Sequence, residues 1–153
     1  MRKEKVELLA PAGSFESLQA AINAGADAVY FGVEQLNMRA KSINSFSIED
    51  LQEIVERCSE KNIKTYITLN TVMYDHDMQL ARRIVQEAKK NNVDAVIASD
   101  FAIIQICQSL QMPVHVSTQA NVSNIEAVKF FAPFSDVIVL ARELSLTQVD
   151  AIT

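Results

Sequence analysis

The sequence is poor in the residues that interrupt or crosslink a chain. Its 153 residues include no Trp, three Gly, three Pro and two Cys. So little Gly and Pro excludes a collagen-like or Pro/Gly-rich disordered chain, and two cysteines exclude a disulfide-rich scaffold. Cys58 and Cys107 are far apart and form no CxxC motif, so we expect two buried, reduced thiols. The remainder is 49% hydrophobic and has the length of one globular domain.

Positive charge is also scarce. The formal net charge is −5, which argues against a broad nucleic-acid-binding surface, because such surfaces need a basic stripe. A local basic patch around Arg39, Lys41 and Arg142 stays open. The basic N-terminus leads into an apolar run that Glu7 and Pro11 interrupt, too short for a signal peptide or a membrane span. We therefore expect a cytoplasmic protein without membrane contact.

Common catalytic motifs are missing as well. The sequence contains no GxSxG, HExxH, P-loop or GxGxxG pattern. Ser117 follows His115 by two positions, side by side on one strand with no third group, which does not make a nucleophile and its base. His115, Glu7 and Asp100 have no spacing typical of metal ligands. We predict no metal site, and the catalytic residues stay unknown.

Short β-branched runs alternate with longer amphipathic stretches, which indicates repeated βα units and a parallel sheet. We predict six strands, near residues 6–10, 28–32, 64–70, 95–99, 114–119 and 137–142. Three of them follow a weak internal repeat, GADAVYFG, NVDAVIAS and FSDVIVLA, which places an Asp just before the apolar run. We expect Asp27, Asp94 and Asp136 at the N-terminal rim of the sheet, with a structural role in turns.

Helix starts complete the predicted architecture. Ser47, Ser123 and Ser145 each precede an acidic or amide side chain by three residues, which indicates helix caps. The helix from Ser145 has run about two turns when the sequence ends at Thr153. We predict an α/β fold, a partial (β/α)₈ TIM-like barrel, with residues 1–153 a single domain truncated in its sixth helix. A complete six-stranded doubly wound sheet is the alternative. An open barrel leaves two edge strands, so a homo-oligomer through them is expected.

The inner face of this predicted barrel is polar. Alternation along a strand turns Val114 and Val116 towards helices and their neighbours towards the barrel axis. The polar inner residues are Glu7, Tyr66, Thr68, Asn70, His115, Ser117 and Gln119. Barrel interiors are usually filled with Val, Ile and Leu, and each unpaired buried polar group costs about 1–3 kcal/mol. This interior is therefore too polar for packing alone.

More polar residues gather where the strands end, at the face where parallel α/β folds bind ligands. They are Asn70, Ser99, Asp100, Thr118, Gln119, Asn121, Arg142 and Glu143. Amides, hydroxyls and an Arg/Glu pair suit a small polar ligand, planar or anionic. We predict these substrate-binding residues: Asn70, His115, Ser117, Gln119, Asn121, Arg142 and Glu143. Two structural interpretations stay open, an interior His115 bonded to Glu7 or a hydroxyl and a rim salt bridge from Arg142 to Glu143.

Four stretches together resemble one known family. They are ELLAPAG at the first strand, GADAVYFG at the second, HVSTQANVSN at the fifth and VLARELSL at the sixth. They follow the family's order from Glu7 almost to the C-terminus, and LNMRAKSINSFSIEDL resembles the segment between the second strand and the second helix. The sequence is similar to the peptidase U32 family, also called collagenase-like proteases.

The resemblance implies a TIM-like barrel in bacterial proteins of disputed chemistry. Some members are called proteases. Others are associated with oxygen-independent hydroxylation of tRNA uridine at C5, of ribosomal RNA or of ubiquinone precursors, with prephenate as oxygen donor and an iron–sulfur cluster. The pattern LNMRA, STQAN and ARELSL is most similar to the tRNA-hydroxylation branch.

The resemblance also implies that the cofactor-binding residues lie in another part of the full-length protein. The family's cluster-ligating cysteines lie beyond the sixth strand, and neither Cys58 nor Cys107 matches them. We therefore expect no cofactor in this fragment and no activity of the fragment alone, with the cluster, prephenate and tRNA belonging to the full-length enzyme. Because nothing resembles a peptidase nucleophile, metal motif or paired-aspartate site, hydroxylation ranks above proteolysis. A collagenase-like peptidase and a ligand-binding module without catalysis are the alternatives.

Overall fold

Six short strands form one parallel sheet. The computed structural model describes residues 6–34, 36 and 46–153. The strands are β1 (Leu9–Pro11), β2 (Ala28–Phe31), β3 (Lys64–Leu69), β4 (Ala95–Ala98), β5 (Val114–Val116) and β6 (Val137–Ile138). They follow one another in the sheet in chain order, and every neighbouring pair is parallel. The predicted α/β class and all six strands are confirmed.

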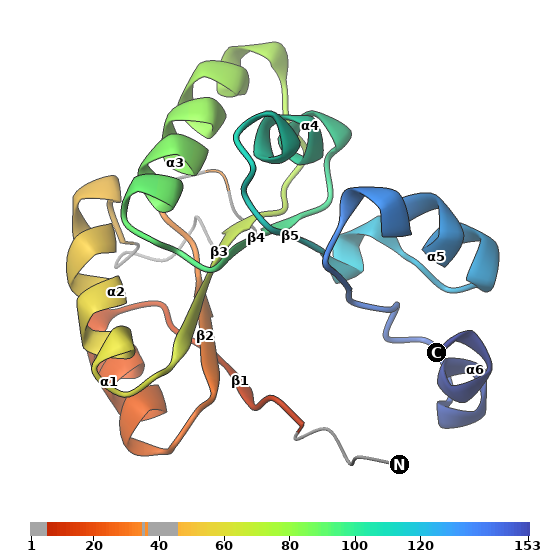
Figure 1. Cartoon of the computed structure of the whole chain (residues 1–153), viewed down its shortest axis with the longest axis horizontal. Helices are drawn as coiled ribbons and strands as arrows, with labels where there is room; N and C mark the ends of the chain where they lie inside the picture. Colours follow the sequence, from red (N-terminus) through yellow and green to blue (C-terminus); the bar gives the residue numbers. More distant parts are fainter. Residues whose placement is uncertain (1–5, 35, 37–45) are drawn as a thin grey trace.

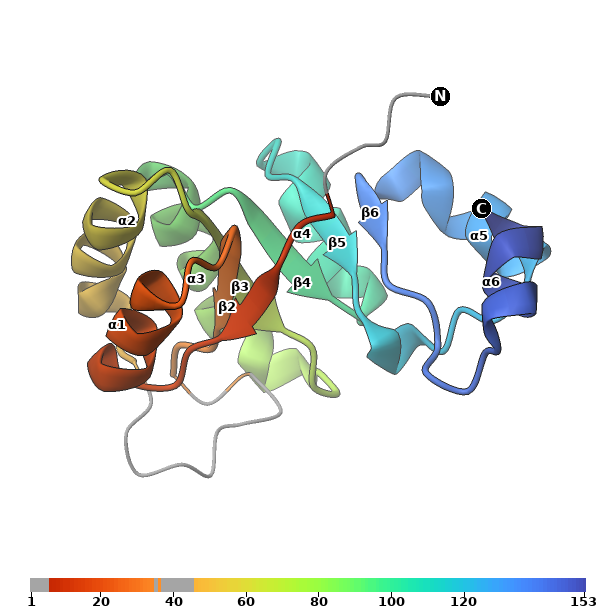
Figure 2. The ribbon, with the colours of Figure 1, turned by 90° about the horizontal axis from the view of Figure 1, so that it is seen from below.

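Helices follow the strands one by one. They are α1 (Phe15–Asn23), α2 (Leu51–Ser59), α3 (Met78–Lys90), α4 (Phe101–Ser109), α5 (Ile125–Phe131) and α6 (Leu146–Ile152), with 3₁₀ segments η1 (Ile48–Asp50), η2 (Asp75–Asp77), η3 (Thr118–Ala120) and η4 (Ala132–Phe134). Figure 1 shows α1 to α4 around the outer side of the curved sheet, and Figure 2 shows β6 beside β5 with α6 beyond them. No helix in the described part of the chain is long and apolar enough to cross a membrane.

The strand order decides between the two predicted architectures. A doubly wound sheet has its first strand inside the order, flanked on both sides. Here β1 lies at one edge and β6 at the other, and the helices cover a single face. The structure is therefore an open, partial (β/α)₈ barrel of six βα units, and the doubly wound alternative is wrong.

The two faces of the sheet differ as the alternation predicts. Ile67, Leu69, Val114 and Val116 are buried in the main core, between the sheet and the helices. Each contributes about 1.5–3 kcal/mol by leaving water, so this face holds the helices in place. Tyr66 belongs instead to a small separate cluster on the inner face. The inner face is thus left for polar groups and a ligand.

Three strands differ from their predicted bounds by more than one residue. β1 begins at Leu9 instead of residue 6, because the Leu8 N–H bonds to the Asp27 carboxylate rather than to a backbone carbonyl of the neighbouring strand. β5 ends at Val116 instead of residue 119, because the Ser117 side chain caps a 3₁₀ turn. β6 has only two residues and pairs on one side, with β5.

Two of the three predicted helix starts are confirmed. Ser47 forms a capping box at the start of η1 and α2, and Ser145 forms one at α6. The prediction for Ser123 is wrong by one residue. Asn124 is the N-cap of α5, and its side-chain oxygen accepts a hydrogen bond from the Ala127 N–H at 2.9 Å. Asn caps a helix as well as Ser does, so the cap can form at Asn124 without loss of stability.

Asp27, Asp94 and Asp136 form the same clip three times. Each carboxylate accepts the backbone N–H of a residue at the start of the preceding strand. The donors are Leu8, Thr65 and Val114, at 2.9, 2.7 and 2.9 Å. Each Asp N–H donates in return to the carbonyl of the same residue, at 2.9, 3.0 and 2.8 Å. The expected structural role at the N-terminal rim is confirmed, and the clips join β1 to β2, β3 to β4, and β5 to β6.

Both cysteines are structural. Cys58 in α2 and Cys107 in α4 are free and fully buried. Burial, with a smaller contribution from the Asp94 charge, raises the pKa of the Cys58 thiol to about 11, and burial raises the pKa of Cys107 to about 12. The thiols therefore stay protonated at neutral pH, as reduced core residues.

Candidate ligand-binding site

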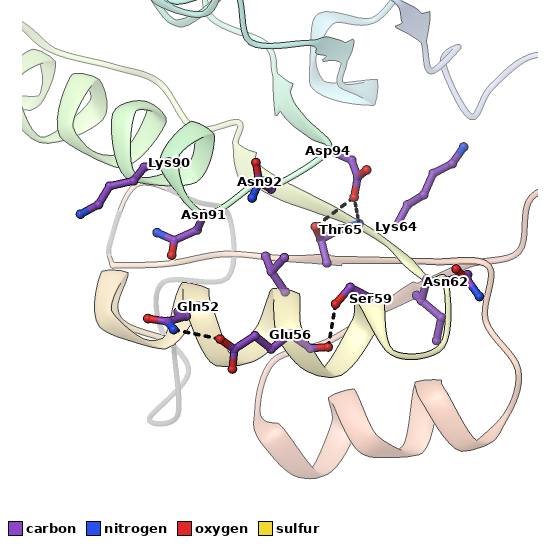
Figure 3. A pocket seen from close by; sticks show the side chains of 12 residues that line it. Gln52, Glu56, Ser59, Asn62, Lys64, Thr65, Lys90, Asn91, Asn92 and Asp94 are labelled. Atoms are coloured by element: carbon purple, nitrogen blue, oxygen red, sulfur yellow. Dashed lines mark hydrogen bonds between the residues drawn. The ribbon is translucent and has the colours of Figure 1, made fainter.

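One cavity lies away from the predicted site. It has a volume of about 640 Å³ and opens between the C-terminal ends of α2 and α3 (Figure 3). Several of its polar groups already bond to one another. Asp94 accepts from both the N–H and the hydroxyl of Thr65, and Glu56 accepts from the Gln52 amide at 2.8 Å.

The position of this cavity also indicates a structural role. Asn62 and Asn92 follow α2 and α3 with left-handed backbones, at φ 55° and 59°, a region that Asn tolerates at helix ends. The cavity lies at the N-terminal face of the strands, the face that contributes stability in barrels. We therefore interpret the side chains of this cavity as structural groups that complete the C-terminal ends of α2 and α3.

A second cavity, of about 410 Å³, lies on the inner face at the C-terminal ends of the strands. It is lined by Leu9, Tyr30, Thr68, Asn70, Ile97, Ser117, Thr118, Gln119, Val139 and Arg142. Its volume suits a small molecule. Leu9, Ile97 and Val139 are its aliphatic side chains, which we call the apolar wall. The rest of the lining carries mainly hydroxyl and amide groups, and Arg142 is the one charged side chain in it. An anionic ligand with an apolar body fits this chemistry.

Backbone bonds explain how the lining comes together. The Ser117 N–H donates to the Ala98 carbonyl at 2.7 Å, which extends the pairing of β5 with β4 to the cavity. The Ala141 N–H donates to the Val122 carbonyl at 2.8 Å. Because Arg142 follows Ala141, this bond brings the arginine to the turn after β5.

Four of the predicted binding residues meet in this cavity. They are Asn70, Ser117, Gln119 and Arg142. Gln119 does so from the turn η3, so the expectation that it continues the inner face of a strand is wrong. The strand stops at Val116 because the next residues form a 3₁₀ turn, capped by the Ser117 side chain, instead of continuing the hydrogen bonds between strands.

Asn121 and Glu143 are not part of the lining. Asn121 is exposed and ends η3 with a left-handed backbone, φ 52°. Glu143 is exposed, and no ion pair joins it to Arg142 within the described residues, so the rim salt bridge is not formed. Asp100 of the predicted rim caps α4, accepting from the Ala102 N–H at 2.8 Å.

His115 lies below the cavity, on the floor of the inner face. Its ring contacts the ring of Tyr66 edge to face, with the centroids 4.5 Å apart. The Tyr66 hydroxyl donates to Glu7 at 2.8 Å, and Lys64 donates to the other carboxylate oxygen at 2.8 Å. Among the described residues His115 has no hydrogen-bond partner, so the alternative with a bond to Glu7 is not realised.

The charges of the floor explain its pKa directions. Burial lowers the pKa of His115, against the opposing charges of Glu7, Asp136 and Asp94. Partial burial acts to raise the pKa of Glu7, but the hydrogen bonds from Lys64 and Tyr66 outweigh it and the net shift is downward. The floor therefore holds a neutral imidazole beside an ionised carboxylate at neutral pH.

Sequence reasoning missed Tyr30 and the apolar wall. Tyr30 lies in β2 between Val29 and Phe31, both buried in the helix-facing core. Alternation in β2 would have turned Tyr30 inward, so the signal was present. Leu9 and Val139 line the cavity from opposite edges of the sheet, which only the curvature brings together.

The residues present do not fit an iron–sulfur cluster. Such a cluster needs exposed or clustered thiolates, whereas Cys58 and Cys107 are buried, protonated core residues. No group of three or more His, Cys, Asp or Glu in the described part could hold a metal ion. Arg39 and Lys41, of the basic patch, lie outside the described residues.

Comparison with known proteins identifies the family. A family model described as peptidase family U32 matches residues 13–153. The chain belongs to peptidase family U32. A solved structure of this family, the U32 peptidase Mk0906, superposes with a TM-score of 0.75 at 16% identity, covering 99% of this chain and 67% of that one. Deoxyribose phosphate aldolase from Aeropyrum pernix, with a TM-score of 0.67 at 17% identity over 87% and 63% of the two chains, shares the fold.

The U32 relatives carry two kinds of names. A protein named collagenase from Porphyromonas gingivalis is 51% identical over 99% of this chain and 37% of its own length. tRNA hydroxylation protein P1 from Bacillus subtilis is 36% identical over 95% of this chain and 35% of its length. The 23S rRNA 5-hydroxycytidine C2501 synthase of Escherichia coli is 36% identical over 97% and 22%. The chain spans about a third or less of the length of these relatives.

Proposed function

We propose that the protein carrying this chain is an oxygen-independent RNA hydroxylase, acting on tRNA uridine, and that this partial barrel binds its small-molecule co-substrate. The cavity at the C-terminal strand ends carries the proposal, because its lining combines one arginine with amides, hydroxyls and an apolar wall. A guanidinium pairs with a carboxylate, and the wall of Leu9, Ile97 and Val139 accommodates a ring.

Prephenate has this combination of a ring and carboxylates, and the family resemblance implies it as the oxygen donor. The relatives named for tRNA and rRNA hydroxylation support the reaction class. Since the two cysteines do not suit a cluster, we place the iron–sulfur ligands outside residues 1–153. In this proposal Arg142 holds a carboxylate, and Gln119 and Asn70 bond to polar groups of the ligand.

A peptidase is the second candidate, because the collagenase-named relative is 51% identical. The described residues offer it little chemistry. Ser117 is 2% exposed and has no base beside it, and both cysteines are buried thiols with raised pKa values.

Two measurements on the intact protein test the proposal. Mass spectrometry of tRNA and rRNA nucleosides, with and without the gene, should show loss of a hydroxylated pyrimidine. Calorimetric titration with prephenate should show binding that Arg142→Ala weakens about 10- to 100-fold, the loss of hydrogen bonds to a charged group. Glu143→Ala is the matched control, since its side chain lies outside the cavity lining.

Unchanged nucleosides together with cleavage of gelatin would replace this proposal with proteolysis. Prephenate binding without any change in nucleosides would favour a ligand-binding module.

A further inference from the structure

Ser117 is the one buried hydroxyl where β5 meets the cavity. It is 2% exposed. Its Oγ accepts the backbone N–H of Gln119 at 3.2 Å and the side-chain amide of Asn70 at 3.4 Å. One oxygen therefore connects the end of β3 with the turn after β5, at the two places that present amide groups to the cavity.

The same hydroxyl starts the turn that carries Gln119. Ser117 is extended, at φ −70° and ψ 154°, and its carbonyl accepts the Ala120 N–H at 2.9 Å. The Asn121 N–H then closes on the Thr118 carbonyl at 3.0 Å. Such a side-chain bond to the backbone two residues ahead competes with a continued strand ladder. Without this bond, the Gln119 N–H would have no acceptor. The first residue of the turn would then lose the side chain that caps it.

The hydrogen bonds that Ser117 accepts favour a structural role for its hydroxyl. A hydroxyl oxygen has two acceptor lone pairs, and the two amide donors use both. Within the described part of the chain no base bonds to Ser117, since the His115 ring packs on Tyr66 at the floor. Ser117 Oγ therefore has no acceptor position left for a ligand, and nothing beside it would activate it as a nucleophile.

We propose that Ser117 is a positioning residue, which sets Gln119 and Asn70 for ligand binding through its two accepted hydrogen bonds. This inference rests on the proposed ligand-binding function of the cavity. It separates the STQ sequence into an internal support, Ser117, and a ligand-contacting amide, Gln119.

The test compares Ser117→Ala and Ser117→Thr in the intact protein, with prephenate as the titrated probe. Loss of one neutral hydrogen bond corresponds to about a fivefold weaker binding, which we expect for Ser117→Ala. Ser117→Thr keeps the Oγ and should bind within about twofold of the wild type. In an Asn70→Ala/Gln119→Ala background, Ser117→Ala should have little further effect, because both amides through which it acts are then absent.

A control separates positioning from general destabilisation. Thr65→Val removes another buried hydroxyl, at the opposite end of β3, where it bonds to Asp94 at 3.1 Å. It should lower the melting temperature without changing prephenate binding. In addition, the NMR amide resonance of Gln119 should shift in Ser117→Ala and return in Ser117→Thr.

The outcomes are distinct for the two proposals. The positioning role is overturned by wild-type affinity in Ser117→Ala, or by a full further effect of Ser117→Ala in the Asn70→Ala/Gln119→Ala background. Weaker binding by Arg142→Ala would still support the proposed function. Absence of prephenate binding by the wild type, or full binding by Arg142→Ala, overturns the proposed function and the inference with it.

Discussion

His115 and Ser117 are two residues apart on the same face, and their neighbours give them different roles. His115 packs on the Tyr66 ring, beside the Glu7 carboxylate that Tyr66 and Lys64 hold. Ser117 accepts two amide donors at the cavity. The inner face is therefore layered, with an internally bonded floor beneath a rim of amides and hydroxyls. Under the proposed function, the residues of this face that contact the ligand belong to the rim.

The bond from Tyr66 to Glu7 should contribute to stability. It joins β3 to the segment before β1, across β2, with a donor that is 3% exposed. Tyr66→Phe should lower the free energy of unfolding by about 1 kcal/mol, at the low end for a bond to a charged group because Glu7 is partly exposed. Urea unfolding measures this. Tyr74→Phe, at a tyrosine 61% exposed, is the control and should change nothing.

His115 should make the protein less stable in acid. Its pKa is lowered by burial in the fold, with Glu7, Asp136 and Asp94 opposing and Lys64 assisting. As pH falls through the unfolded value of about 6.5, the unfolded chain takes up a proton that the folded chain resists, so stability drops by at most about 1.4 kcal/mol per pH unit.

His115→Phe should remove this contribution to the fall in the free energy of unfolding with pH. Urea unfolding curves recorded between neutral and mildly acid pH measure it. His76→Gln, at the other histidine, should leave it in place, since that side chain is 80% exposed. An unchanged slope in His115→Phe would show that His115 titrates alike in both states.

At the scale of elements, the three aspartate clips divide the sheet into strand pairs. Each clip closes the N-terminal end of one βαβ unit with two reciprocal hydrogen bonds. The spacing between clips is two strands, so the weak sequence repeat corresponds to a structural repeat of two βα units. Each pair therefore has its own anchor, independent of the helices that cover it.

Removing one clip should destabilise the sheet locally. Asp94→Ala leaves the Thr65 N–H and hydroxyl without their acceptor, at a residue 1% exposed. We expect a loss of about 1–3 kcal/mol in the free energy of unfolding. Asp150→Ala, at an exposed carboxylate in α6, is the matched control. Equal stability of both variants would show that water replaces the carboxylate without cost.

At the scale of the whole molecule, the curved sheet has two open edges. Among the described residues β1 pairs only with β2 and β6 only with β5. Apolar side chains line this opening, with Leu9, Val137 and Val139 exposed by 39%, 45% and 37%. Unpaired edges with apolar neighbours favour pairing with another strand.

We expect the 153-residue chain to self-associate through these edges at high concentration. Val137→Lys places a charge beside the β6 edge and should shift sedimentation profiles towards the monomer. Val72→Lys is the control, at a valine 73% exposed outside the strands. Equal association of both variants would exclude the β6 edge as the contact.

Much of the fold follows from local patterns. Strand positions, the split between Val114 and its neighbour His115, and the aspartate turns depend on alternation and on side chains near in sequence. The ends of β5 and the cap of α5 were less predictable, because Ser117, Ser123 and Asn124 each suit more than one local structure. The binding residues were predicted as one set because side-chain chemistry alone does not separate floor from rim.

The sequence by itself determined the six βα units, the polar inner face and the U32 family, since these depend on periodicity and on motifs of consecutive residues. Only the tertiary structure decided which polar residues share a cavity. Arg142 reaches it through the bond between Ala141 and Val122, and Ser117, also in the lining, accepts hydrogen bonds from Gln119 and Asn70. Those contacts join residues distant in the chain or redirect a strand into a turn, and both depend on the curvature of the assembled sheet.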